Sequence, residues 1–153
     1  MKHLKPFLEA SGWESINVGE LKDFANNSHF AYLIDEGFSL DVFSTINGSL
    51  FNYANALSDN SYFNLFSYIR IVKKNGDKLI LFNWDDIKDY FIPFLSLVIR
   101  KYNLGNHAVN FGIERHGVPG VSSYSVKDVI NDNIWSGTFS NLPIKYISIK
   151  KYN

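Results

Sequence analysis

The stretch that decides the fold runs from Tyr62 to Trp84 and reads YFNLFSYIRIVKKNGDKLILFNW. Its first half, Tyr62 to Lys73, is rich in aromatic and β-branched residues, with apolar side chains on both faces of an extended chain. A strand that is apolar on both sides is typical of the middle of a covered sheet. Asn75-Gly76 follows, and this pair is the strongest short-range signal for a tight hairpin turn. The sequence therefore predicts a central β-hairpin whose return strand covers Leu79 to Trp84.

The segments on either side of this hairpin carry both helical and strand patterns. Helices are expected over Val18–Asn27, over a short segment capped by Ser49 in which Leu50, Ala54 and Leu57 share a stripe, from Asp85 or Asp86 to Lys101, and over Ser125–Trp135. Strands are expected over Ser39–Ile46, His107–His116 and Leu142–Lys151, with a turn at Gly117–Gly120. Pro93 should kink the long helix or divide it in two. This order predicts a single α+β domain over residues 1–153, with a largely antiparallel central sheet of about five strands flanked by helices.

The composition is that of a folded domain. Of the 153 residues, 46% are hydrophobic and 20% are charged, which excludes a disordered tail or a collagen-like repeat. Cysteine is missing, so disulfides, thiolate nucleophiles and cysteine-based metal sites are excluded as well. Met1 to Ala10 lacks the apolar run of a secretory signal, and the sequence predicts a cytoplasmic protein without a membrane span.

The charges are unevenly distributed although the formal net charge is zero. Eight acids and one base lie between Glu9 and Asn60, whereas the chain from Ser61 onward has more bases than acids. A neutral total argues against direct nucleic-acid binding, which normally needs a surplus of lysine and arginine. The acidic third favours a surface that attracts a cationic partner. Scattering of the same acids over several solvated faces is the alternative.

Catalytic signatures are missing from the sequence. The chain has no phosphate-binding glycine loop and no Gly-x-Ser-x-Gly elbow. The most site-like cluster is His107, Asn110, Glu114 and His116, in which two histidines and a carboxylate could bind a metal or a His–Glu pair could transfer a proton. On one strand, however, His107 has the opposite parity to Glu114 and His116. The plainer interpretation is the polar side of a half-buried strand, and we expect no metal and no cofactor.

These features favour a non-enzymatic binding protein. Our hypothesis is a bacterial immunity or antitoxin-like inhibitor that covers the active or nucleic-acid-binding surface of a cationic toxin domain with an acidic, aromatic face. The residues expected to bind this partner are Glu14, Asp35, Glu36, Asp41, Tyr53 and Asp59. Two alternatives stay open: a small hydrolase or nuclease-like enzyme that uses His107, Glu114 and His116, and a structural subunit. The sequence leaves the oligomeric state open.

Overall fold

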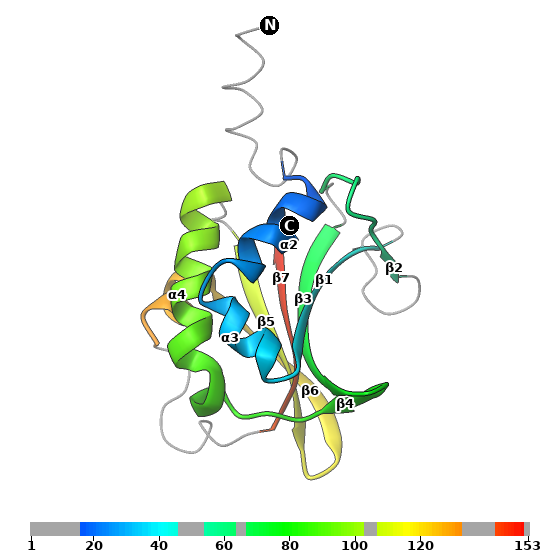
Figure 1. The fold of residues 1–153 in the computed structure, drawn as a ribbon. Helices are drawn as coiled ribbons and strands as arrows, with labels where there is room; N and C mark the ends of the chain where they lie inside the picture. Colours follow the sequence, from blue (N-terminus) through cyan, green and yellow to red (C-terminus); the bar gives the residue numbers. More distant parts are fainter. Residues whose placement is uncertain (1–15, 46–53, 64–66, 103–106, 133–142, 152–153) are drawn as a thin grey trace, which may run out of the picture.

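A curved antiparallel sheet forms the centre of the molecule, and helices cover one of its faces (Figure 1). The computed structural model describes residues 16–45, 54–63, 67–102, 107–132 and 143–151. Its helices are α2 (Val18–Asn26), α3 (Phe30–Asp35), α4 (Trp84–Tyr102) and α5 (Val126–Ile130). Its strands are β1 (Phe38–Thr45), β2 (Ala54–Ala56), β3 (Ser67–Asn75), β4 (Lys78–Ile80), β5 (His107–Arg115), β6 (Val118–Ser125) and β7 (Ile144–Lys151). The α+β class and the central antiparallel sheet are confirmed.

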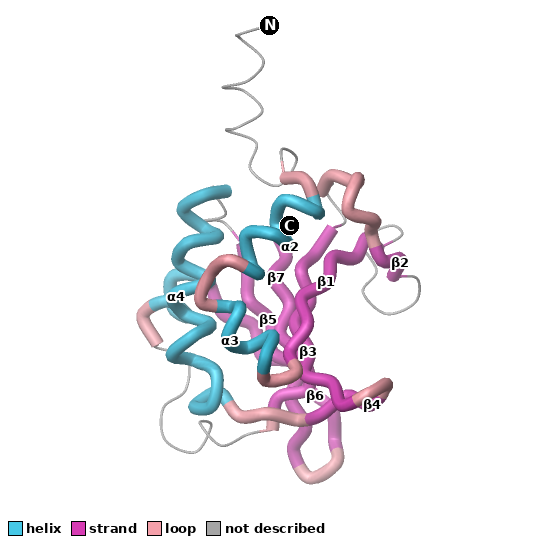
Figure 2. Tube along the Cα trace, in the orientation of Figure 1, coloured by secondary structure: helices cyan, strands magenta, loops and turns pink. Residues whose placement is uncertain are grey.

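The sheet has seven strands in the described part of the chain, two more than the sequence predicted. Their order is β2-β1-β3-β7-β5-β6, with β4 paired to the end of β3 (Figure 2). The strand expected at the centre, β3, does lie there, hydrogen-bonded to β1 on one side and to β7 on the other. Ile69 and Ile71 of this strand belong to the core under the helices, whereas Tyr68 and Val72 are buried on the face that the helices leave free.

The predicted hairpin exists, but its turn and its return strand differ from the expectation. Asn75 pairs with Lys78, so the loop residues are Gly76 and Asp77 rather than Asn75 and Gly76. Gly76 has φ +64° at the first loop position, which is the requirement of a type II′ turn. The return strand is only three residues long, and Trp84 already belongs to α4.

The helical layer packs on the sheet through α4, which runs on through Pro93 without being divided. Ile87, Phe91, Phe94 and Val98 form its buried stripe, at the spacing that places apolar side chains on one side of a helix. At its start, the buried Trp84 indole donates a hydrogen bond of 2.9 Å from Nε1 to Oδ1 of Asp132.

None of the helices in the described ranges combines the length and the apolar character needed to cross a membrane.

Two local predictions were wrong, and a third was confirmed only in part. Ala54–Ala56, expected in a helix capped by Ser49, is strand β2, paired with the end of β1; Ser49 itself lies outside the described residues. The expected turn at Gly117–Gly120 is mostly strand β6, an edge strand in which Pro119 is tolerated. The helix expected over Ser125–Trp135 is present as α5, where Ser125 Oγ accepts a hydrogen bond from the amide of Asp128, but it ends at Ile130. Residues 133–135 lie outside the described residues.

Candidate functional site

The acidic residues predicted to bind a partner fall in different places. Asp35 and Glu36 are exposed at the end of α3, on the helical side of the sheet. Asp41 lies on the opposite face, because its neighbours Leu40 and Val42 point into the core. Asp59 lies near α2, where its Oδ1 is 3.1 Å from Nζ of Lys22. The two further members of the predicted set, Glu14 and Tyr53, lie outside the described residues.

Glu36 borders a groove of about 310 Å³ between α3, α4 and the chain that follows β4. We call it the acidic groove. Its polar lining includes the carboxylates of Glu36 and Asp86, the phenols of Tyr32 and Tyr90, and Lys73. Sequence analysis identified Glu36 from its charge, but nothing in the local pattern placed Asp86, fifty residues away, on the same groove.

The two tyrosines of the acidic groove stack on each other. The ring centroids of Tyr32 and Tyr90 are 4.0 Å apart and the ring planes differ by 12°. The side-chain hydrogen bond with Tyr90, and then the charges of Tyr90 and Glu36, raise the pKa of the Tyr32 phenol. Tyr32 is 48% exposed and Leu81, on the same groove, is 43% exposed. The groove therefore offers a flat aromatic surface and an apolar side chain to solvent next to two carboxylates.

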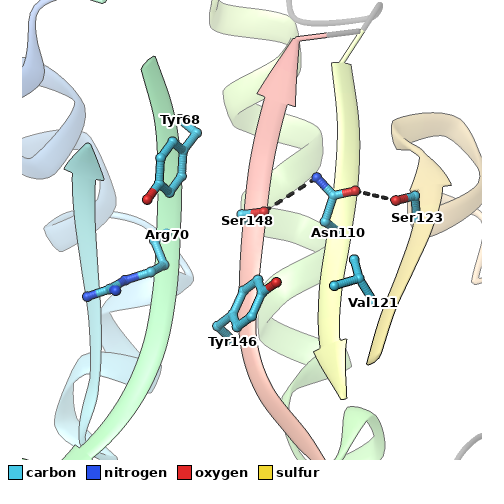
Figure 3. A pocket seen from close by; sticks show the side chains of 7 residues that line it. All are labelled: Tyr68, Arg70, Asn110, Val121, Ser123, Tyr146 and Ser148. Carbon is cyan, nitrogen blue, oxygen red and sulfur yellow. Dashed lines mark hydrogen bonds between the residues drawn. The ribbon is translucent and has the colours of Figure 1, made fainter. Parts of the chain in front are cut away.

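A second pocket, of about 410 Å³, lies on the sheet face that the helices leave free (Figure 3). We call it the sheet pocket. Its described lining comes from β3, β7, β5 and β6, and consists of Tyr68, Arg70, Tyr146, Ser148, Asn110, Val121 and Ser123. This pocket was missed by the sequence analysis, which treated the strand within Tyr62 to Lys73 as covered on both faces.

Strand register brings the polar residues of the sheet pocket into one row. Arg70 is paired with Ser148, Ser148 with Asn110, and Asn110 with Ser123. Ser123 Oγ donates a hydrogen bond to Oδ1 of Asn110, and Nδ2 of Asn110 donates to Ser148 Oγ at 3.4 Å (Figure 3). Asp41 continues the row on β1, directly opposite Arg70.

Arg70 is the charged residue of the described pocket lining. Its guanidinium lies over the Phe43 ring, with Cζ 4.3 Å from the ring centroid. Nε of Arg70 is buried without a hydrogen-bond partner among the described residues. Within the same residues, no carboxylate comes close enough to Arg70 to form an ion pair.

Two tyrosines form the aromatic part of the sheet pocket. Burial raises the pKa of the Tyr68 phenol, and the nearby Arg70 charge opposes this effect. Burial, and then the charge of Tyr68, raise the pKa of Tyr146. The ring of Tyr146 lies over Gly112 on the neighbouring strand, where a Cβ atom would collide with it. Gly112 therefore provides the space in which this ring lies against the sheet.

The histidine cluster of the enzyme alternative does not converge. His107 is buried at the start of β5, and His116 is exposed in the turn after its end, with φ +52°. At ~3.3 Å per residue, Glu114 lies roughly 20 Å along the strand from His107. Among the described residues, no three histidine or acidic side chains gather closely enough to hold a metal ion.

No protein-family model, curated protein or solved structure matches the chain.

Proposed function

We propose that the protein is a non-enzymatic inhibitor that docks a basic protein partner on the acidic groove. The observation that carries this proposal is the stacked Tyr32–Tyr90 pair beside the carboxylates of Glu36 and Asp86. Tyrosine is enriched at binding hot spots because it combines a large contact area with a polar tip. Carboxylates around such an anchor attract a cationic surface and favour its correct orientation.

The surroundings of the groove add to its acidic character. Asp35 is exposed beside Glu36, and Asp89 is exposed on α4, one turn beyond Asp86. Lys73 lies in the groove as a partial counter-charge, and its ammonium group is 5.5 Å from the centroid of the Phe38 ring. A partner with several lysines or arginines complements this arrangement better than an acidic partner does.

The specific form of the proposal is an immunity or antitoxin-like protein of a bacterial cell, acting in the cytoplasm on a cationic toxin domain. Its support is the pair Asp35 and Glu36 from the acid-rich N-terminal third, and the lack of a catalytic motif in the sequence. Inhibition would be steric and electrostatic, with carboxylates occupying positions that substrate phosphates take in the toxin.

The experiment compares association kinetics of purified variants with a partner captured from the native host. Glu36→Gln combined with Asp86→Asn should slow association and flatten its salt dependence, because long-range attraction acts mainly on the association rate. Tyr32→Ala should mainly accelerate dissociation, since it removes a contact formed only in the complex. At ~0.15 M salt the screening length is about 8 Å, so only acids near the contact should matter.

Asp41→Asn is the matched control for the single variant Asp86→Asn, because it also removes one negative charge, but from the opposite face of the sheet. It should leave both rates within about twofold of wild type. The proposal fails if the groove variants bind with wild-type rates and salt slope, or if Asp41→Asn has the larger effect.

A further inference from the structure

The sheet pocket has a chemistry that the acidic groove lacks. Its described lining contains one cation, Arg70, several hydroxyl groups and one amide, and no carboxylate. The hydrogen-bond chain has a direction: Ser123 donates to Asn110, and Asn110 donates to Ser148. The Ser148 hydroxyl accepts at this point, so its own hydrogen can be donated to another group.

The guanidinium of Arg70 supplies the charged donors of the pocket, and it extends over β1, away from Ser148 (Figure 3). Arg70 and Ser148 are paired in register on adjacent strands, and Ser148 is only 3% exposed. The buried Nε of Arg70 lacks an acceptor among the described residues. A buried donor of a charged group is costly to leave unsatisfied, and the planar guanidinium matches the two oxygens of a carboxylate or a phosphate.

Flat and apolar surfaces form the remaining lining. Tyr68 is 6% exposed and lies deep in the site, Tyr146 lies over Gly112, and Val121 is exposed on β6 (Figure 3). The volume of about 410 Å³ lies within the range of small-molecule sites, which commonly combine apolar surfaces with a few placed polar groups.

We infer that the sheet pocket binds a small organic anion, in which a carboxylate or phosphate meets Arg70 and a planar ring lies against Tyr68 and Tyr146. This site is separate from the proposed docking function, because strands alone line it and the helices lie behind the sheet (Figure 3). The anion would satisfy Nε of Arg70, and the ring would occupy the aromatic part of the pocket.

The experiment uses two matched pairs of probes in calorimetric titrations of the full chain. The first pair is 5′-AMP and adenosine, which differ in the phosphate, and the second is 1-naphthoate and 1-naphthamide, which differ in the carboxylate. At least one anion should bind, about tenfold or more tightly than its neutral partner, since hydrogen bonds to a charged group are strong. The pair that shows this difference identifies the anion as a phosphate or a carboxylate.

Three variants assign the binding to the pocket. Arg70→Gln should weaken the anion about tenfold or more, and Arg70→Lys should recover only part of the loss, because an ammonium group lacks the two-pronged guanidinium geometry. Val121→Trp should block the pocket from an exposed position without disturbing the core. This third variant keeps the test decisive if substitution of the half-buried Arg70 impairs folding.

Lys145→Gln is the control for net charge, because Lys145 is exposed on β7 and is not among the pocket-lining residues. It should bind the anion like wild type. The inference is overturned if neither anion binds at millimolar concentration, if each neutral probe binds as tightly as its anion, or if Val121→Trp leaves the affinity unchanged. If the protein binds its protein partner but no anion, the proposed function is supported and the anion site is refuted. If it binds the anion but no basic partner at the acidic groove, the anion site is supported and the proposed function is refuted.

Discussion

Alanine at position 112 should push the Tyr146 ring off the sheet. A Cβ atom on Gly112 would lie 2.6 Å from Cζ of Tyr146 and closer still to Cε2 and Cδ2. Because carbon atoms pack at about 3.5–4.0 Å, the ring has to move by at least about 1 Å.

The cost follows from the contact that the ring loses. A tyrosine side chain buries about 150–250 Å², and losing half of that at ~25 cal/mol per Å² costs about 2–3 kcal/mol. Replacing glycine by alanine returns about 0.4–1 kcal/mol by restricting the unfolded chain. The net loss of unfolding free energy for Gly112→Ala is therefore about 1–3 kcal/mol.

A double-mutant cycle measured by urea denaturation tests this explanation. In a Tyr146→Ala background there is no ring to displace, so Gly112→Ala should be neutral or slightly stabilising. Gly120→Ala on β6 is the control, because the nearest atom to its Cβ is Cγ1 of Ile113 at 3.9 Å; it should change stability by less than about 1 kcal/mol. Equal destabilisation by Gly112→Ala in both backgrounds would refute the idea that this glycine is there to accommodate the ring.

Three further predictions concern the core and the tyrosines. Ile71→Ala should cost about 2–5 kcal/mol in denaturant titration, since Ile71 is 1% exposed in the central strand, and a loss below about 1 kcal/mol would contradict that position. Trp84→Phe should cost about 1 kcal/mol in the same assay through the lost hydrogen bond to Asp132, whereas a loss above about 3 kcal/mol would implicate the shape of the indole instead. Burial raises the pKa of the Tyr102 and Tyr146 phenols above the ordinary 10.0. As the pH rises, these phenols therefore ionise in the unfolded chain before they ionise in the folded protein. The stability that they contribute is present below about pH 10 and is lost as the pH rises through the folded-state pKa values. An unfolding midpoint that stays constant from about pH 9 to about pH 11 would contradict this last prediction.

The parts of the fold that were predicted are those in which burial imposes a repeating pattern. The apolar stripe of α4 and the alternation of β5 are visible in the sequence because each element presents one face to the same core. The central place of β3 was visible for a related reason, since both of its faces carry apolar residues.

The parts that were missed have little buried apolar surface to impose a pattern. Strand β6 is exposed along most of its length, and its Pro119 and Gly120 are residues that normally mark turns. It is a strand because β5 supplies backbone partners along its whole length. Ala54–Ala56 likewise owes its extended conformation to pairing with β1, although its sequence continued a helical stripe. Where pairing with another segment decides the conformation, local propensity is a poor guide.

The sheet pocket was out of reach of the sequence for a different reason, because it depends on register rather than on pattern. Arg70, Asn110, Ser123 and Ser148 come from four strands, and nothing local to any of them fixes which residue lies opposite which. What each strand does reveal is a face: Tyr68 with Arg70, Tyr146 with Ser148, and Asn110 with Gly112 are spaced two residues apart and so lie on one side of their strands. The core residues between them, such as Ile69, Ile147 and Phe111, fix that side as the one away from the helices. The same alternation that builds the core therefore gathers an arginine, an amide, hydroxyls and two aromatic rings on the opposite face, and a ligand for that face has to match all of these groups together.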